Sequence, residues 1–570
     1  MKFFDLLSRF YVFVKTNSWL FFILIIAVLL RGYGIYFDYP FGTNFIWDEI
    51  FSVVYIFDVL ETKNIFIGTY QYPLLLPLLY LPGLFLRLIY LALTHGIYNL
   101  EKLKELLIVG GIDQVYIIVR WYSVAFGTAT VYFLYKIYHL IFKNKASAYY
   151  AALVYSVSLA PVFIAHWGKT HSIMVFFIIV SLYTALKYET TKRDKYFYFC
   201  SLWAACAFSI HYIGASVAIL PFYLYITNWR KINFKKLLSA FFIYLSVVGT
   251  FYGLNIPGVK GMLNNNLCYF QSSGTVGMSS VGFWERFYYI PFDSFNVEPV
   301  FITLFIFLLI YNFLSLIKNN LVRYIFVILG FNYLFTITIV AWPGVIRWQM
   351  TFITLAISLG GALLFELLQR KLLNRRLIYF IASLFLLPSL LITCKWLSLI
   401  NNNTMLETSR WLEENVKNNE IVYSFDRYLE TPLSYEAVKY HIEQNNHSSK
   451  KAEYVLNNKD KLDGFGVNLF YDYDNYRYQA LGGTSTKYII VSFWNLENGY
   501  ALKKDAKRNL EEVEKYHRLK LVKTFYPTKN DTVPDVEWGD IDILNNPIRL
   551  QTLFKLKSSG PFFEIYEVIN

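Results

Sequence analysis

Apolar runs of membrane length dominate the first 400 residues and constrain the fold more than any other feature. A membrane-spanning helix needs about 20 mostly apolar residues. Eleven runs come close to that length: 17–37, 115–140, 147–165, 173–189, 196–211, 213–228, 237–255, 297–317, 321–341, 349–368 and 377–397. Only 16 % of the residues are charged, whereas soluble domains have about 25 %. The sequence therefore predicts an all-α polytopic membrane domain over residues 1–400.

The basic residues predict how these helices are oriented. A twelfth run, 72–95, is long enough to span but contains Pro73, Pro77 and Pro82. If it does not cross and the N-terminus is cytoplasmic, the inner loops hold 19 Lys and Arg in 53 residues, and the outer connections only 8 in 132. Because Lys and Arg favour cytoplasmic loops, we predict about eleven crossings. The run 72–95 is then a proline-broken interfacial or re-entrant segment within a first outer loop over 38–114.

This orientation also accounts for the net charge of +13. Most basic residues before the tail flank cytoplasmic helix ends, so we predict no nucleic-acid partner. We expect a multi-pass protein of the plasma membrane, in contact with the lipid bilayer on all sides. Three of the four cysteines lie in apolar runs, which argues against a disulfide framework.

The tail, residues 401–570, is polar and falls outside the membrane in this scheme. The segment 408–418 has helical spacing behind Thr408, a candidate N-cap. The segments EIVYSF, KYIIVSFW, LKLVKTFY and PFFEIYEVI are typical of strands. We therefore predict a C-terminal, extracytoplasmic soluble α/β domain.

Two adjacent carboxylates, Asp48 and Glu49, stand among aromatic residues in NFIWDEIF (44–51), shortly after the first run. The predicted orientation places them on the outer face. A carboxylate there can accept the proton of an attacking hydroxyl, and cations stabilise the charge on a departing phosphate. Cations and imidazoles expected on the same face are Arg120, Lys169, Arg347, His166, His171 and His211. The set predicts transfer of a group from a phosphate-bearing lipid to a nucleophile.

Each of these residues also has a purely structural interpretation. Asp48 and Glu49 fit a polar helix start, since acidic residues favour first turns. The histidines fit interfacial or structural positions. Arg347 fits an aromatic belt beside Trp342 and Trp348. A metal site built from the carboxylates and histidines has no diagnostic spacing, so we predict no metal or cofactor, with a divalent metal as the alternative.

The order of these motifs resembles a known family. Residues 44–83, NFIWDEIFSVVYIFDVLETKNIFIGTYQYPLLLPLLYLPG, are similar to the first outer loop of GT-C glycosyltransferases. The closest likeness is to dolichyl-phosphate-mannose protein mannosyltransferases and aminoarabinose transferases. Residues 120–166 resemble that family's next two helices. The family's Tyr/His-Pro-Pro-Leu element corresponds to Tyr72-Pro73-Leu74, with one proline missing, which implies a substrate-site role for Tyr72.

The resemblance also implies roles for individual residues. Asp48 matches the catalytic base, and Arg347 matches an arginine that contacts the donor phosphate. Where the family has a second acidic residue, this chain has His171. The implied activity is inverting transfer of a hexosyl or pentosyl group from a polyprenyl-phosphate donor to a hydroxyl of a protein, lipid or glycan acceptor.

Two alternatives remain open at this point. One is a transferase or ligase of whole lipid-linked oligosaccharides. The other is a transporter or flippase, which predicts inverted repeats and charges near the bilayer midplane, whereas the charges here gather at one face.

Overall fold

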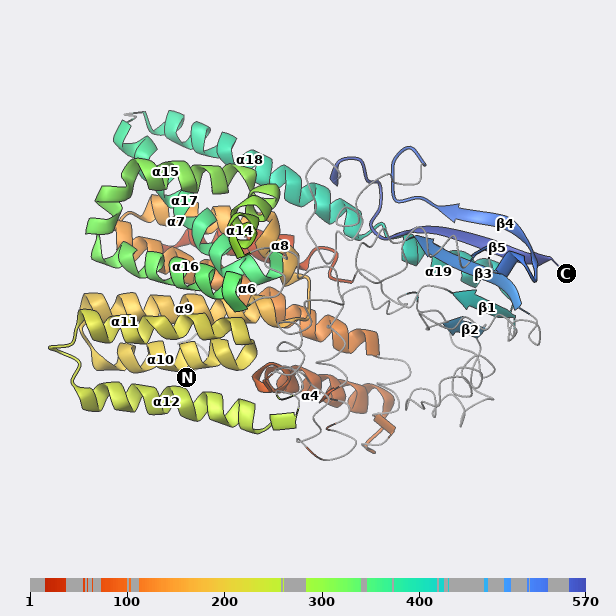
Figure 1. Ribbon diagram of the computed structural model, residues 1–570, viewed down its shortest axis with the longest axis horizontal. Helices are drawn as coiled ribbons and strands as arrows, with labels where there is room; N and C mark the ends of the chain where they lie inside the picture. The colour runs from red at the N-terminus through yellow and green to blue at the C-terminus, as the bar shows by residue number, and fades with distance from the viewer. Residues whose placement is uncertain are drawn as a thin grey trace. The chain divides into compact units, whose positions relative to one another are not determined.

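The computed structural model covers the whole chain (Figure 1) and describes most of its helices and strands. The described ranges, with isolated positions between them, are 16–36, 73–99, 112–257, 283–339, 346–371, 374–417, 420–424, 466–469, 486–493, 513–531 and 553–569. Asp48, Glu49, Tyr72 and Cys268 lie outside the described residues.

The chain divides into two compact units. A helical unit takes its described residues from 1–35, 48–85 and 117–394, and a sheet unit takes those from 36–47, 86–116 and 395–570. An all-helical part and a C-terminal part with a sheet were both predicted from the sequence, and both are confirmed. The domain boundary at residue 400 stays a prediction.

Helices make up nearly all of the described first 400 residues. In chain order they are α2 (Ser18–Gly32), α4 (Leu75–His95), α6 (Ile112–Phe142), α7 (Lys145–Val157), α8 (Leu159–Ala165), α9 (Thr170–Thr191), α10 (Asp194–Ile210), η1 (Tyr212–Ala218), α11 (Ile219–Thr227), α12 (Phe234–Gly253), α14 (Phe283–Val297), α15 (Pro299–Lys318), α16 (Asn320–Ile339), η2 (Ile346–Gln349), α17 (Met350–Lys371) and α18 (Arg375–Ile400). Within the helical unit α10 packs between α9 and α12, and α17 packs against both α7 and α15 (Figure 1).

Each of the eleven predicted apolar runs overlaps one or more of these helices. In the part of the chain that the structure describes, eight helices are long and apolar enough to cross a membrane, or nine if α7 and α8 form one bent span. The helices α2 and η1–α11 are apolar but shorter. The predicted count of eleven crossings stays a prediction.

The expected proline break in 72–95 is wrong for residues 75–95. Helix α4 runs without interruption from Leu75 to His95, with Pro82 inside it. Pro77 falls in the first turn, where a backbone N–H has no intrahelical acceptor, so a proline costs little there. Helix α4 packs against α6 next to Pro82. There the Gly83 N–H donates to the Tyr122 hydroxyl of α6 at 3.0 Å. By length and composition α4 is one of the eight candidate spans.

The sheet unit contains a five-stranded mixed sheet. Its strands are β1 (Ile421–Ser424), β2 (Gly466–Leu469), β3 (Thr486–Phe493), β4 (Arg518–Phe525) and β5 (Phe562–Ile569). The strand order is β2-β1-β3-β5-β4; β1 pairs in parallel with β2 and β3, and β5 pairs antiparallel with β3 and β4. The four predicted strands are confirmed, and β2 was not predicted.

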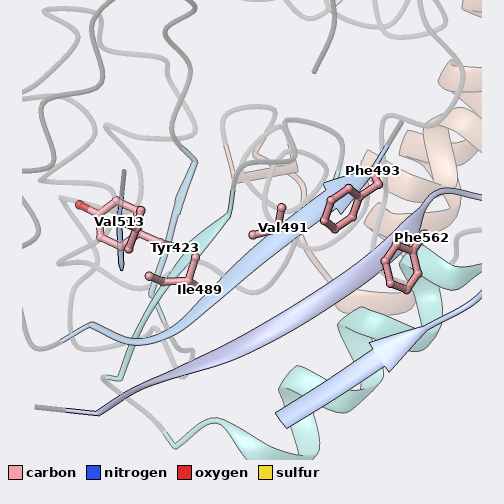
Figure 2. Close-up of a cluster of buried hydrophobic side chains, with 6 residues drawn as sticks. All are labelled: Tyr423, Ile489, Val491, Phe493, Val513 and Phe562. Carbon is pink, nitrogen blue, oxygen red and sulfur yellow. The ribbon is translucent and has the colours of Figure 1, made fainter. Parts of the chain in front are cut away.

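One face of this sheet buries an apolar cluster (Figure 2). Ile489, Val491 and Phe493 alternate along β3, so their side chains lie on the same face. Tyr423 of β1 and Phe562 of β5 extend the cluster on either side. The β-branched and aromatic residues of KYIIVSFW are therefore those of a buried strand.

Helix α19 (Thr404–Asn415) contacts strand β3. The ring centroid of Trp411 in α19 lies 5.5 Å from that of Tyr488 in β3. Its N-cap is Asn403, whose side chain accepts the Met405 N–H at 2.8 Å. The predicted cap at Thr408 is wrong. Thr408 is buried one turn inside the helix, where its hydroxyl donates to the Thr404 carbonyl.

Candidate functional site

Three turns of the helical unit bring aromatic and imidazole rings around Trp348. Its ring centroid lies 5.2 Å from that of His171, 5.1 Å from that of His211 and 6.0 Å from that of Tyr212. The guanidinium carbon of Arg347 lies 5.0 Å from the centroid of the Trp348 ring. These residues come from the start of α9, the end of α10 and η2, so folding gathers segments that are far apart in sequence.

Lys169 adds a second cation next to this group. Its Nζ lies 4.6 Å from the centroid of the Trp167 ring, and that ring lies 6.4 Å from the His171 ring. Its charge acts on His171 together with that of Arg347. We call the six side chains the basic–aromatic cluster: Lys169, His171, His211, Tyr212, Arg347 and Trp348. Four of them were predicted as site residues: Lys169, His171, His211 and Arg347.

The cluster combines buried and accessible groups. Lys169, His171 and His211 are at most 5 % exposed. Arg347 and Trp348 are only partly buried, so both can meet a ligand. Within the described residues, the Arg347 Nε and the His171 Nε2 make no hydrogen bond. The arrangement offers an aromatic surface with cations beside it, which suits an anion attached to an apolar or sugar group.

The His211 imidazole is neutral and has a fixed tautomer. Its Nδ1 accepts the backbone N–H of Ile213 at 3.2 Å, which caps η1 and leaves the ring proton on Nε2. The positive charge at this place therefore comes from Lys169 and Arg347, not from His211.

Hydrogen bonds to α14 fix the direction of η2. The Gln349 amide donates from Nε2 to the Asp293 carboxylate at 3.3 Å, and its Oε1 accepts the Ser294 hydroxyl at 3.0 Å. Because Gln349 directly follows Trp348, these bonds orient the turn that carries Arg347 and Trp348. Sequence reasoning missed this role of Gln349 and took Trp348 for an aromatic-belt residue. The signal was present in the close grouping of arginine, tryptophan and glutamine in WPGVIRWQ.

Arg120 and His166, which were also predicted for the site, bind the end of α2. The Arg120 Nη1 donates to the Ile35 carbonyl at 3.1 Å. The His166 Nε2 lies 2.8 Å from the Tyr33 carbonyl and its Nδ1 lies 2.8 Å from the Val162 carbonyl. Burial lowers the pKa of His166 to about 4, so the neutral ring donates to one of these carbonyls at a time. Both residues hold the turn from which the chain enters the segment with Asp48.

Among the residues that the structure describes, no group of three or more His, Cys, Asp or Glu side chains is arranged to hold a metal ion. The predicted catalytic pair Asp48 and Glu49 and the predicted substrate-site residue Tyr72 fall outside those residues. Their roles stay predictions.

A protein-family model matches the part of the chain that contains three residues of the cluster. Residues 111–252 match the family model described as dolichyl-phosphate-mannose-protein mannosyltransferase. Over this stretch the chain is similar to that family. The match includes Lys169, His171 and His211, and it confirms the resemblance that the sequence predicted. No curated protein matches the chain.

Similar solved structures include proteins of yeast, bacterial and archaeal origin. The Pmt1-Pmt2 protein O-mannosyltransferase complex of S. cerevisiae, bound to its sugar donor, matches with 17 % identity and a TM-score of 0.30 over 45 % of this chain and 34 % of its own. ArnT from Cupriavidus metallidurans bound to undecaprenyl phosphate matches with 10 % identity and a TM-score of 0.47 over 89 % of this chain and 96 % of its own. The oligosaccharyltransferase AglB from Archaeoglobus fulgidus matches with 11 % identity and a TM-score of 0.41 over 92 % and 75 %.

Proposed function

We propose that the protein is an integral-membrane inverting glycosyltransferase that uses a polyprenyl-phosphate sugar as donor. The observation that carries the proposal is the basic–aromatic cluster. Of its two cations, Arg347 lies against the partly exposed Trp348 ring and Lys169 lies against the buried Trp167 ring, and the region around them is largely buried. A donor of this class has an anionic phosphate between a sugar and a lipid chain, so it needs cations in a water-poor site.

In the proposed reaction the acceptor hydroxyl attacks the anomeric carbon of the donor sugar. Asp48 takes the hydroxyl proton, a new C–O bond forms with inversion, and the bond from the anomeric carbon to the phosphate oxygen breaks. Polyprenyl phosphate leaves with the electron pair of that bond. Arg347 and Lys169 stabilise the charge that builds on the leaving phosphate. Glu49 and Tyr72 orient the acceptor or the loop.

The predicted orientation belongs to the same proposal. The N-terminus is cytoplasmic, the C-terminal domain lies outside, and the cluster faces the outer side of the plasma membrane. The acceptor is an extracytoplasmic hydroxyl of a protein, lipid or glycan. The support is the family match over 111–252 together with the excess of Lys and Arg in the predicted inner loops.

The test is donor binding and transfer by purified Arg347 variants. Removing a charged bidentate donor should weaken binding of a synthetic polyprenyl-phosphate sugar by about 10- to 100-fold in Arg347→Ala. Arg347→Lys keeps the charge but loses the fork, so it should fall between Arg347→Ala and the wild type. Scintillation proximity with labelled donor in nanodiscs gives the dissociation constants, and the same samples give transfer rates.

Arg323→Ala is the matched control. Arg323 is an exposed arginine at the start of α16 whose Nε donates to the Ile317 carbonyl. Its loss should change neither binding nor transfer. Wild-type binding by Arg347→Ala would leave Arg347 as an interfacial residue and refute its phosphate role. Transfer of a lipid-linked oligosaccharide but not of a single sugar would favour the oligosaccharide transferase instead.

A further inference from the structure

Helix α9 begins without the groups that usually stabilise a helix N-terminus. Its N-cap is Lys169, which makes no side-chain cap bond, and its first turn contains no acidic residue. The Ser172 hydroxyl donates to the Ser123 carbonyl of α6 at 2.9 Å. The first backbone N–H groups of a helix have no intrahelical acceptor and bear a partial positive charge. Because Lys169 adds its own positive charge at this end, the helix start favours an anion beside it.

The two ring side chains that flank Lys169 in the sequence are buried. Trp167 is fully buried, and His171 is 4 % exposed. In the part of the chain that the structure describes, neither the Trp167 Nε1 nor the His171 Nε2 makes a hydrogen bond. The Thr170 hydroxyl lies 3.4 Å from the His171 Nδ1, and when it donates there the neutral ring carries its proton on Nε2. A buried donor without an acceptor lowers the stability of the fold, so both nitrogens favour an acceptor atom of a ligand.

The two cations of the basic–aromatic cluster lie near the same two rings. The Lys169 Nζ lies 4.6 Å from the centroid of the Trp167 ring, which is 6.4 Å from that of His171. The Trp348 ring links His171 to Arg347: its centroid lies 5.2 Å from that of His171 and 5.0 Å from the guanidinium carbon. The Arg347 Nε is a third N–H donor without a hydrogen bond among the described residues. Such a collection of donors and positive charge suits a group with several anionic oxygens.

We infer that the N-terminus of α9 is the phosphate subsite of the donor, where the Trp167 Nε1 and the His171 Nε2 donate to phosphate oxygens. Lys169 and Arg347 supply the balancing charge, and the two ring N–H groups fix the position of the phosphate by hydrogen bonds. The inference rests on the proposed function and adds two binding residues to it. The polyprenyl phosphate that leaves has lost its sugar and has more negative charge than the donor, so the same contacts stabilise the leaving group.

Binding of polyprenyl phosphate to purified full-length variants in nanodiscs tests the subsite. Trp167→Phe removes an N–H and keeps an aromatic ring, and His171→Leu removes the imidazole. Each should raise the dissociation constant by about 10- to 100-fold, because a hydrogen bond to a charged group is lost. His171→Gln places an amide N–H near the position of Nε2, so it should restore most of the affinity. A side chain that acts by packing alone gives no such rescue. Trp167→Phe decides the outcome if His171→Leu fails to fold.

Two further probes identify the part of the lipid that the subsite binds. Polyprenol has the same chain but no anionic oxygen, so its binding should be unchanged in the Trp167 and His171 variants. Inorganic phosphate has the oxygens but no chain, so it should bind the wild type at least about 100-fold more weakly than polyprenyl phosphate does. Equal affinities for these two phosphates would indicate a free-anion site and overturn the assignment to the donor. Equal weakening of polyprenol and polyprenyl phosphate binding would leave both side chains as packing residues.

Two residues of the helical unit provide matched controls. His139 also has a ring nitrogen, Nδ1, that makes no hydrogen bond within the described chain, but it lies in the last turn of α6, where a helix favours cations and not anions. Trp203 is a partly buried tryptophan of α10. His139→Leu and Trp203→Phe should bind polyprenyl phosphate as tightly as the wild type.

Arg347→Ala, measured on the same samples, separates this inference from the proposed function. Polyprenyl phosphate binding that Arg347→Ala does not weaken contradicts the proposed function. Binding that Arg347→Ala weakens, but that Trp167→Phe and His171→Leu leave at wild-type strength, overturns the subsite alone.

Discussion

Asp48→Asn is expected to lower sugar transfer by about 100- to 10,000-fold and to leave donor binding nearly unchanged. A base is needed only while the acceptor hydroxyl attacks, so its removal affects turnover and not the ground-state complex. Asparagine has nearly the same shape as aspartate, so the substitution removes little besides the proton acceptor. The measurement is single-turnover transfer from a synthetic polyprenyl-phosphate donor by purified protein in nanodiscs, with the donor dissociation constant determined on the same samples.

Glu49→Gln is the neighbouring control for this prediction. If Glu49 orients the acceptor or the loop, its variant should lose much less activity than Asp48→Asn. The order of the two variants therefore identifies which carboxylate takes the proton. Near-normal transfer by Asp48→Asn would remove it from the mechanism and favour the polar helix start as the role of the pair.

The helices could be predicted because their signal is local. Apolar length marks a span without knowledge of any partner, and each of the eleven runs indeed overlaps a helix. The strands of the tail were visible for the same reason, since KYIIVSFW is rich in β-branched and aromatic residues. Strand β2 is only four residues long, and its sequence, GVNL, has no such enrichment. The predicted proline break was wrong for residues 75–95. The sequence cannot show that α4 packs against α6 at Gly83 and stays helical through Pro82.

The site could be predicted in part. Lys169, His171, His211 and Arg347 were selected for their chemistry and expected side of the membrane, and the structure brings all four into one cluster. Trp348 at its centre was not selected, because an aromatic belt gives the same pattern. Arg31, whose guanidinium donates to the Tyr155 and Ser156 carbonyls at the end of α7, could not be found at all. It reaches a carbonyl 125 residues away, and nothing in its local sequence indicates that partner.

The turn that carries His211 depends on Gly214 for a steric reason. A Cβ at Gly214 would overlap the carbonyl oxygen and carbonyl carbon of Ala207. Both are backbone atoms of α10, so neither can move aside as a flexible side chain would. The Gly214 N–H also donates to the His211 carbonyl at 2.8 Å. Only glycine therefore fits where the chain doubles back from α10 into η1.

Gly214→Ala should consequently lower the free energy of unfolding by about 3 kcal/mol or more, as overpacking against fixed atoms does. The control is Gly330→Ala in α16, where a Cβ would meet nothing within 4 Å; it should be neutral or stabilising by up to about 1 kcal/mol. Thermal unfolding in detergent, followed by tryptophan fluorescence, compares the two variants. Because the clash displaces His211 and Tyr212 from Trp348, any folded Gly214→Ala protein should also bind the donor more weakly. A melting temperature as high as that of Gly330→Ala would contradict the close approach of η1 to the backbone of α10 at Gly214.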